Sequence, residues 1–143
     1  MSKTVGNLLA NKGTAVWSID AGATVYEALQ RMAEKDVGAL VILEDGVLAG
    51  IMSERDYARK VILLDRGSRE TEVREIMTSD LITVSSTDSV AECMALMTEH
   101  RIRHLPVVED GGLRGVVSIG DVVKGVIGEQ EALIIQLEAY ITN

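Results

Sequence analysis

Two short segments of the chain pair a serine with an aspartate three positions later. Residues 50–56 read Gly-Ile-Met-Ser-Glu-Arg-Asp, and residues 115–121 read Gly-Val-Val-Ser-Ile-Gly-Asp. In each segment a glycine and two apolar residues close an expected strand, and the serine stands where a helix should begin. A serine at the N-cap leaves the first backbone N–H groups of a helix available to a phosphate, and the aspartate could accept hydrogen bonds from a ribose. The two pairs are Ser53 with Asp56 and Ser118 with Asp121.

A plainer interpretation of both pairs is a helix capping box. In a capping box the serine and the acidic side chain satisfy backbone donors at the start of a helix. Short motifs of this kind also arise by chance. The surrounding sequence must therefore decide between the two interpretations, and the surrounding sequence is itself repeated.

The chain contains an internal repeat. Residues 24–57 align with residues 89–122 without a gap, at a constant offset of 65 positions. Each copy has the pattern strand–helix–strand–strand–helix, and short lead-in segments at 4–10 and 73–77 resemble each other. One such unit would bury too little surface to be stable alone. We therefore expect an α+β fold in which two βαββα repeats pack sheet to sheet about a pseudo-twofold axis and share one core.

Local signals predict the elements of each repeat. Helices should begin at Val25 and Val90 after the N-caps Thr24 and Ser89, and two Asp-Gly pairs should turn hairpins. The expected strands cover residues 15–19, 39–43 and 47–52, and then 81–84, 103–108 and 113–117. Further helices should cover residues 53–64, 118–127 and 129–143, and residues 65–72 should form a surface linker. With their flanks, the two repeats of this intertwined module should occupy residues 1–66 and 67–143.

The composition limits the function and the compartment. The 143 residues include 14 Lys and Arg against 22 Asp and Glu, which gives a net charge of −8. An acidic chain with three Tyr and one Trp lacks the basic footprint of a nucleic-acid-binding protein. Cys93 is the only cysteine, which excludes an intramolecular disulfide and a Cys-rich zinc site. Because no apolar run could span a bilayer and no secretory signal is evident, we expect no membrane partner and a cytoplasmic location.

Three sequence blocks resemble a known family. Residues 52–57 (Met-Ser-Glu-Arg-Asp-Tyr), 73–78 (Val-Arg-Glu-Ile-Met-Thr) and 101–107 (Arg-Ile-Arg-His-Leu-Pro-Val) are similar to tandem cystathionine-beta-synthase-type (CBS) domain pairs. The likeness is to the stand-alone two-CBS proteins of bacteria and plant organelles in particular, and it covers nearly the whole chain. It implies an adenosyl ligand, namely AMP, ADP, ATP, NAD(H) or S-adenosylmethionine. It also implies a homodimer that regulates an unidentified protein partner and does not catalyse a reaction.

The resemblance further implies two nucleotide-binding clefts, each between the serine–aspartate pair of one repeat and the strands of the other. Strand backbone would pair with the adenine edge, apolar side chains would enclose its faces, and the aspartate would hold the ribose hydroxyls. The first cleft would combine Ser53, Arg55 and Asp56 with Thr83, Val84, Ile102, Arg103, His104 and Pro106. The second would combine Ser118, Gly120 and Asp121 with Val16, Trp17, Val37, Gly38, Ala39 and Leu40.

The two expected clefts differ in charge. Arg55, Arg103 and His104 would meet phosphates in the first cleft, where charge-assisted hydrogen bonds are strong. The second cleft has glycine or alanine at the corresponding positions, so it has more room but lacks local positive charge. We therefore expect the first cleft to bind a nucleotide phosphate better. The second should take a bulkier or less charged ligand or stay empty.

Several of these residues also have structural interpretations. Arg55 could be a solvated surface charge, and His104 could be a surface-strand histidine. Trp17 could stack on adenine or, as we slightly favour, plug the edge of the sheet. Met32 and Met97 are expected to fill the core.

The sequence shows no catalytic arrangement. It has no Gly-x-Ser-x-Gly elbow, Cys–His pair or glycine-rich phosphate loop. His100 and His104 are four positions apart, but a predicted helix–strand break separates them, so no metal site is expected. The alternative function is a ligand-free scaffold that dimerises and docks a partner. It is suggested by an apolar stripe on the helix at 129–143, although that stripe could equally dock onto its own chain.

Overall fold

The chain divides into two units whose boundaries differ from those of the repeats. The computed structural model describes residues 3–13 and 16–142. One unit consists of residues 16–81, and the other joins residues 3–13 to residues 82–142. None of the helices in these described ranges is both long and apolar enough to cross a bilayer.

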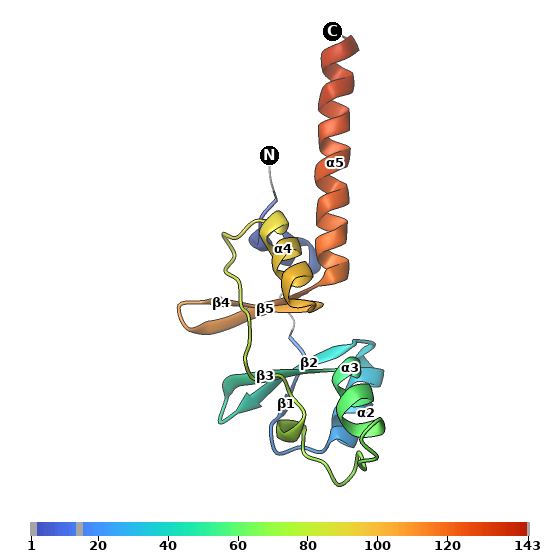
Figure 1. Ribbon diagram of the computed structural model, residues 1–143. Coiled ribbons are helices and arrows are strands. Elements are labelled where there is room, and N and C mark those ends of the chain that lie inside the picture. The colour runs from blue at the N-terminus through green and yellow to red at the C-terminus, as the bar shows by residue number, and fades with distance from the viewer. Residues whose placement is uncertain (1–2, 14–15, 143) are drawn as a thin grey trace. The chain divides into compact units, whose positions relative to one another are not determined.

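The unit of residues 16–81 is built on a three-stranded sheet (Figure 1). Its elements are β1 (Ser18–Asp20), α2 (Val25–Lys35), β2 (Ala39–Glu44), β3 (Val47–Ser53), α3 (Glu54–Tyr57), the π-helix η1 (Ala58–Ile62) and the 3₁₀-helix η2 (Val73–Glu75). Strand β1 runs parallel to β2, and β2 runs antiparallel to β3. Helix α2 makes the crossover that two parallel strands require.

The other unit is built on a two-stranded antiparallel sheet. Its elements are α1 (Val5–Lys12), α4 (Val90–His100), β4 (His104–Glu109), β5 (Gly112–Ser118) and α5 (Ile119–Thr142). Helix α5 follows β5 directly and is a single helix of 24 residues. Figure 1 shows it extending well beyond α4 in its own unit.

Helices α2 and α4 begin at the predicted positions. Thr24 Oγ1 accepts from the Glu27 N–H at 3.1 Å, and Ser89 Oγ accepts from the Glu92 N–H at 3.0 Å. Both helices end at a residue in the left-handed region, Asp36 in one and Arg101 in the other. These residues are 65 positions apart, so the two repeats also share the backbone conformation at their helix ends.

The hairpin turns are also as predicted. Asp45 and Gly46 have φ of 52° and 77°, and Asp110 and Gly111 have φ of 50° and 77°. Two consecutive positive φ angles define the tight turn that matches the twist of antiparallel strands, and Asp-Gly is a favoured sequence for it. These turns fix the register of β2 with β3 and of β4 with β5.

Most buried apolar side chains fall into two clusters, one in each unit, and the expectation of a core shared by both units stays a prediction. Met32 and Met97 lie in the cores, as predicted, and so does Cys93. Burial raises the pKa of the Cys93 thiol to about 11, with Asp88 and Glu92 adding to the effect. The thiol is therefore protonated and unreactive at neutral pH.

Each lead-in segment packs on the other repeat. The Val5 N–H donates to the Asp88 carbonyl at 2.8 Å, and the Val73 N–H donates to the Ala23 carbonyl at 2.8 Å. Helix α1 thus belongs with the second repeat, and η2 belongs with the first. The units consequently divide between residues 81 and 82, while the bounds of the two repeats, 1–66 and 67–143, stay a prediction.

The glycine of each serine–aspartate segment makes room for a lead-in. A Cβ on Gly50 would lie 2.7 Å from the Thr78 carbonyl oxygen, and one on Gly115 would lie 2.9 Å from Leu9 Cδ2. Residues 51 and 78 also form a β-bridge. The absence of a side chain at Gly50 and Gly115 therefore lets the exchanged lead-in segments pack closely against β3 and β5.

Other expected elements differ from the structure. The helix expected over 53–64 is the short α3 followed by a π-helix, and the helices expected over 118–127 and 129–143 are one helix. The strand expected over 81–84 is a single bridge from Val84 to Val107. The expected linker contains a buried residue, Thr71, whose carbonyl accepts from the Val25 N–H. At the start of the strand expected over 15–19, Ala15 lies outside the described residues.

Candidate functional site

Both serine–aspartate pairs form a capping box. The Asp56 N–H donates to Ser53 Oγ at 3.2 Å, while the Ser53 N–H and Oγ–H donate to Asp56 Oδ2 at 2.9 and 3.1 Å. The Asp121 N–H donates to Ser118 Oγ at 3.2 Å, while the Ser118 N–H and Oγ–H donate to Asp121 Oδ2 at 2.8 and 3.0 Å. The plainer interpretation of these pairs is therefore correct, and the ribose role of each aspartate stays a prediction.

The first backbone N–H groups of these helices are mostly occupied. The Glu54 N–H donates to the Gly38 carbonyl at 3.0 Å, and the Ile119 N–H donates to the Arg103 carbonyl at 2.8 Å. Together with the capping bonds, this satisfies the first and third N–H groups of each helix. The expectation that these N–H groups are available to a phosphate is therefore wrong for the first and third of each helix. At the start of α5, the N–H of Gly120 is the one that helix geometry leaves without a partner inside the helix.

A lysine from the lead-in helix contacts Asp121. Lys12, in the last turn of α1, donates from Nζ to Asp121 Oδ2 at 2.7 Å and to the Val116 carbonyl at 2.8 Å. Burial acts to raise the pKa of Asp121, but the hydrogen bonds from Lys12 and Ser118 outweigh it and hold the pKa below its usual value. The Ser118–Asp121 pair therefore has the local positive charge that we expected it to lack.

The sequence analysis missed Lys12 as a site residue. The lysine is 109 positions from Asp121 and belongs to a segment outside the repeat alignment. Its position depends on the packing of α1 against the second repeat, which no local pattern specifies.

In the other unit a lysine also contacts the aspartate, but through the other oxygen. Lys60 Nζ lies 3.3 Å from Asp56 Oδ1 and donates to the Ile76 carbonyl at 2.9 Å. Both carboxylate oxygens of Asp56 are thus engaged. The hydrogen bonds of Asp121 within the described ranges all go to Oδ2, which leaves Oδ1 open.

His104 stands opposite Ser118 in the β4–β5 register, next to the Lys12–Asp121 pair. Burial lowers the pKa of His104, the charge of Lys12 lowers it further, and Asp121 opposes this. An unperturbed histidine has a pKa of about 6.5, so a pKa lowered below that leaves the imidazole of His104 neutral at pH 7. His104 can therefore serve as a hydrogen-bond partner there but does not supply a cation for a phosphate.

The remaining predicted residues divide between the two units. Each expected cleft draws residues from both units, so these groupings stay predictions. Within each unit, the strand register places residues of different expected clefts together, Ala39 beside Ser53 and His104 beside Ser118. The side chains of Leu40, Val84 and Pro106 are buried in their own units. Half-buried residues are Val16, Val37, Gly38, Arg55 and Ile102, and exposed residues are Thr83, Arg103 and Gly120.

A family model for the CBS domain matches residues 12–63 and again residues 73–128. The chain belongs to the CBS-domain family. The mitochondrial CBS domain-containing protein CBSX3 of Arabidopsis thaliana is 43% identical to this chain over 150 residues. The alignment covers 98% of this chain and 72% of that protein. A CBS domain-containing protein of Bacillus subtilis, YhcV, is 32% identical over 83% of this chain and 84% of its own length.

The fold of this CBS pair matches solved CBS structures. The CBS-domain containing protein ATU1752 from Agrobacterium tumefaciens superposes with a TM-score of 0.83 at 35% identity, covering 87% of this chain and 94% of that one. The α+β fold class with two CBS repeats is therefore confirmed. CBS-domain pairs are regulatory modules, and the relatives named here are CBS-domain proteins.

Trp17 of this CBS pair lies at the surface, which corrects our slight preference for a core position. Its side chain is 42% exposed, and Lys35 Nζ lies 4.5 Å from the ring centroid. The Trp17 carbonyl accepts from the Val41 N–H at 3.1 Å, so the backbone of Trp17 pairs with β2 although its side chain is exposed.

Proposed function

We propose that this CBS pair is a regulatory module that binds an adenosyl nucleotide at its serine–aspartate pairs. The ligand would be AMP, ADP or ATP, with NAD(H) and S-adenosylmethionine as further members of the class. CBS domains commonly bind adenosyl ligands, which supports this class. The observation that carries the proposal is the state of Asp121. Its carboxylate is ionised and held in place through Oδ2, and among the described residues Oδ1 receives no hydrogen bond.

A fixed carboxylate with an open oxygen is suited to a ribose diol. A carboxylate accepts hydrogen bonds at both oxygens, and hydrogen bonds to an ionised acceptor are stronger than neutral ones. The orientation of Asp121 is set in advance by Ser118 and Lys12, so little conformational freedom is lost when a sugar binds. In our proposal Asp56 plays the same role in the first repeat.

The base would lie against strand residues near each pair. We propose that the backbone of residues 38–40 and 102–104 offers hydrogen bonds to the adenine edge, and that Val37, Ile102 and Trp17 supply apolar surface. The half-buried state of Val37 and Ile102 supports this use, because each exposes part of its side chain. Thr83 and Arg103, both exposed, would contact the phosphate or sugar.

The module would act on a partner protein through its own conformational equilibrium. A ligand shifts that equilibrium only by its difference in affinity for the two states. No catalytic step is proposed. The single cysteine is buried and protonated, and the described residues contain no group of three or more His, Cys, Asp or Glu arranged to hold a metal ion.

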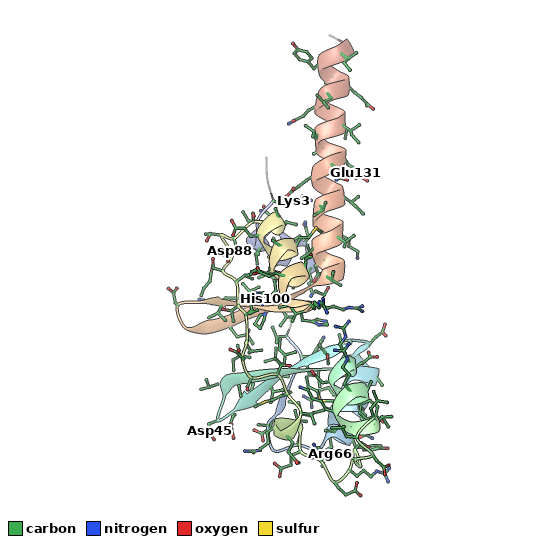
Figure 2. All side chains as sticks on the ribbon, in the orientation of Figure 1. Lys3, Asp45, Arg66, Asp88, His100 and Glu131 are labelled. Atoms are coloured by element: carbon green, nitrogen blue, oxygen red, sulfur yellow. The ribbon has the colours of Figure 1, made fainter. Side chains whose placement is uncertain are left out.

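A second role, self-association, is favoured by the distal half of α5. Exposed apolar side chains recur there at helical spacing, on Leu133, Ile134, Leu137, Tyr140 and Ile141. Figure 2 shows this half of α5, with Glu131 labelled, extending its side chains away from the rest of its unit. The stripe does not dock onto the described part of its own unit. We propose that it pairs with a second copy of the chain to form a homodimer in the cytoplasm.

A thermal-shift panel of AMP, ADP, ATP, NAD(H) and S-adenosylmethionine tests the proposed function. A ligand present at about 100 times its dissociation constant should stabilise the protein by roughly 2.7 kcal/mol. Adenosyl compounds should raise Tm, while GMP and CMP, which carry the same phosphate and sugar on other bases, should have a smaller effect. A panel in which no adenosyl compound raises Tm would contradict nucleotide binding and favour the scaffold.

A further inference from the structure

Lys12 is held where two segments far apart in the chain meet. Its helix α1 is anchored to the second repeat by Val5, Leu8 and Leu9, all of which are buried in that unit's core. From the last turn of α1 the ammonium reaches Asp121 Oδ2 and the Val116 carbonyl. The anchoring fixes the lysine relative to the capping box.

The two repeats supply this lysine in different ways. In the first repeat, Lys60 lies one turn after Asp56 on the same helical segment. The position equivalent to Lys60 in the second repeat is Gly125, where a Cβ would lie 2.9 Å from Leu8 Cδ2 and 3.2 Å from Val90 Cγ1. A lysine at that position would require Leu8 and Val90 to shift from their packing. The cation comes from α1 instead.

Because the lysine comes from a different segment in each repeat, it contacts a different oxygen of the aspartate carboxylate. Lys60 lies 3.3 Å from Oδ1 of Asp56 while Ser53 donates to Oδ2, so a ribose hydroxyl that reaches Oδ1 would share that oxygen with an ion pair. Lys12 shares Oδ2 of Asp121 with Ser118, so Oδ1 can accept a hydroxyl without losing an ion pair.

An ammonium group has three N–H donors. Lys12 uses two of them, on Val116 and Asp121, and its side chain is 37% exposed. The third donor belongs to an ammonium that contacts Asp121, the third residue of α5, and at this helix start the N–H of Gly120 has no partner inside the helix. These two donors and the open carboxylate oxygen lie at the same end of one helix and could contact a phosphate and a sugar of one molecule.

We propose that Lys12 is a specificity-determining residue of the Ser118–Asp121 site, selecting nucleotides over nucleosides by donating to a phosphate oxygen while it orients Asp121 for the ribose. This inference rests on the proposed nucleotide binding. It makes the second-repeat site the tighter site for AMP, which reverses the order that the sequence indicated. It also ties nucleotide affinity to the docking of α1.

The test compares AMP with adenosine on the full chain by isothermal titration calorimetry. Lys12→Met should lower the affinity of the tightest AMP site about tenfold or more, because it removes a charge-assisted hydrogen bond. Adenosine, which lacks the phosphate, should lose much less, so the ratio of AMP to adenosine affinity should fall. Lys12→Arg should restore most of that ratio. Lys124→Met, an equal change of charge at an exposed position of α5, should leave it unchanged.

The outcomes separate the two proposals. If wild-type protein binds neither AMP nor adenosine, the proposed function itself fails, and the role of Lys12 fails with it. If wild-type protein binds AMP but Lys12→Met keeps the wild-type ratio, or binds AMP more tightly, only the role of Lys12 is overturned. Circular dichroism of each variant shows whether it is folded. Should Lys12→Met fail to fold, Lys12→Arg carries the test. A wild-type ratio of AMP to adenosine affinity in Lys12→Arg supports the inference, and a ratio reduced tenfold in this folded variant, which keeps the charge, overturns it.

Discussion

The glycines at positions 50 and 115 offer a matched pair of substitutions that tests the exchange of the lead-in segments. A Cβ on Gly50 would lie 2.7 Å from the Thr78 carbonyl oxygen and 2.8 Å from Met77 Sδ. The Thr78 backbone cannot easily move, because its N–H and carbonyl both bond to Ile51, at 2.8 and 3.0 Å. At Gly115 the nearest atoms, Cδ2 and Cδ1 of Leu9, belong to a side chain that can change rotamer.

The expected free-energy changes follow from these contacts. Overpacking of a tight site costs about 1–3 kcal/mol, and replacing glycine by alanine in a strand recovers about 0.5–1 kcal/mol. Gly50→Ala should therefore lower the free energy of unfolding by about 1–2 kcal/mol, which corresponds to a fall in Tm of about 2–8 °C. Gly115→Ala should cost less than about 1 kcal/mol, because Leu9 can yield.

Urea unfolding of the two variants measures the difference, and hydrogen exchange localises it. In Gly50→Ala, the amides of Ile51 and Thr78 should exchange faster than in the wild type, while those of α1 should keep their protection. Equal losses of stability in the two variants, or a larger loss for Gly115→Ala, would refute the packing of residues 73–78 described here.

Three further predictions concern the capping boxes and α5. Ser53→Ala and Ser118→Ala should each cost about 1 kcal/mol in urea unfolding, because each removes an N-cap; a cost near zero would contradict the bonds described. The pKa of Asp121 is lowered in the folded state, so its stabilising contribution is present above about pH 4 and is lost as the pH falls through the folded pKa. The difference in unfolding free energy between wild type and Asp121→Asn should accordingly be larger at pH 7 than at pH 3, and a pH-independent difference would show that the carboxylate charge has no part in it. Leu137→Glu should shift a dimer toward monomer in analytical ultracentrifugation while the exposed control Gln136→Glu should not, and a monomeric wild type would argue against pairing through α5.

The parts of the fold that were predicted correctly depend on local chemistry. N-caps at Thr24 and Ser89 and the Asp-Gly turns each fix the backbone within a few residues, so the sequence specifies them directly. Because the two repeats align at an offset of 65 positions, each element assigned in one repeat also predicted the equivalent element in the other. For the same reason the serine–aspartate spacing indicated a capping box as one of its two interpretations.

The parts that were not predicted depend on contacts between distant segments. The exchange of lead-ins is decided by which surface buries Val5 and Val73, and a periodic pattern gives no indication of that partner. The contact of Lys12 with Asp121 was missed for the same reason, because it depends on the surface against which α1 packs. The two helices expected over 118–127 and 129–143 leave only Gly128 between them, and because one glycine costs a helix only about 1 kcal/mol, α5 continues through it.

The central claim, that the aspartates bind the ribose of an adenine nucleotide, is tested most directly by titrating wild-type protein with AMP and with 2′-deoxy-AMP in the calorimeter. Losing one hydroxyl leaves a buried acceptor without its donor, which costs about 1–3 kcal/mol, so AMP should bind about tenfold more tightly or better. This preference should disappear in the double variant Asp56→Asn with Asp121→Asn. Equal affinity of the wild type for the two nucleotides would contradict the claim.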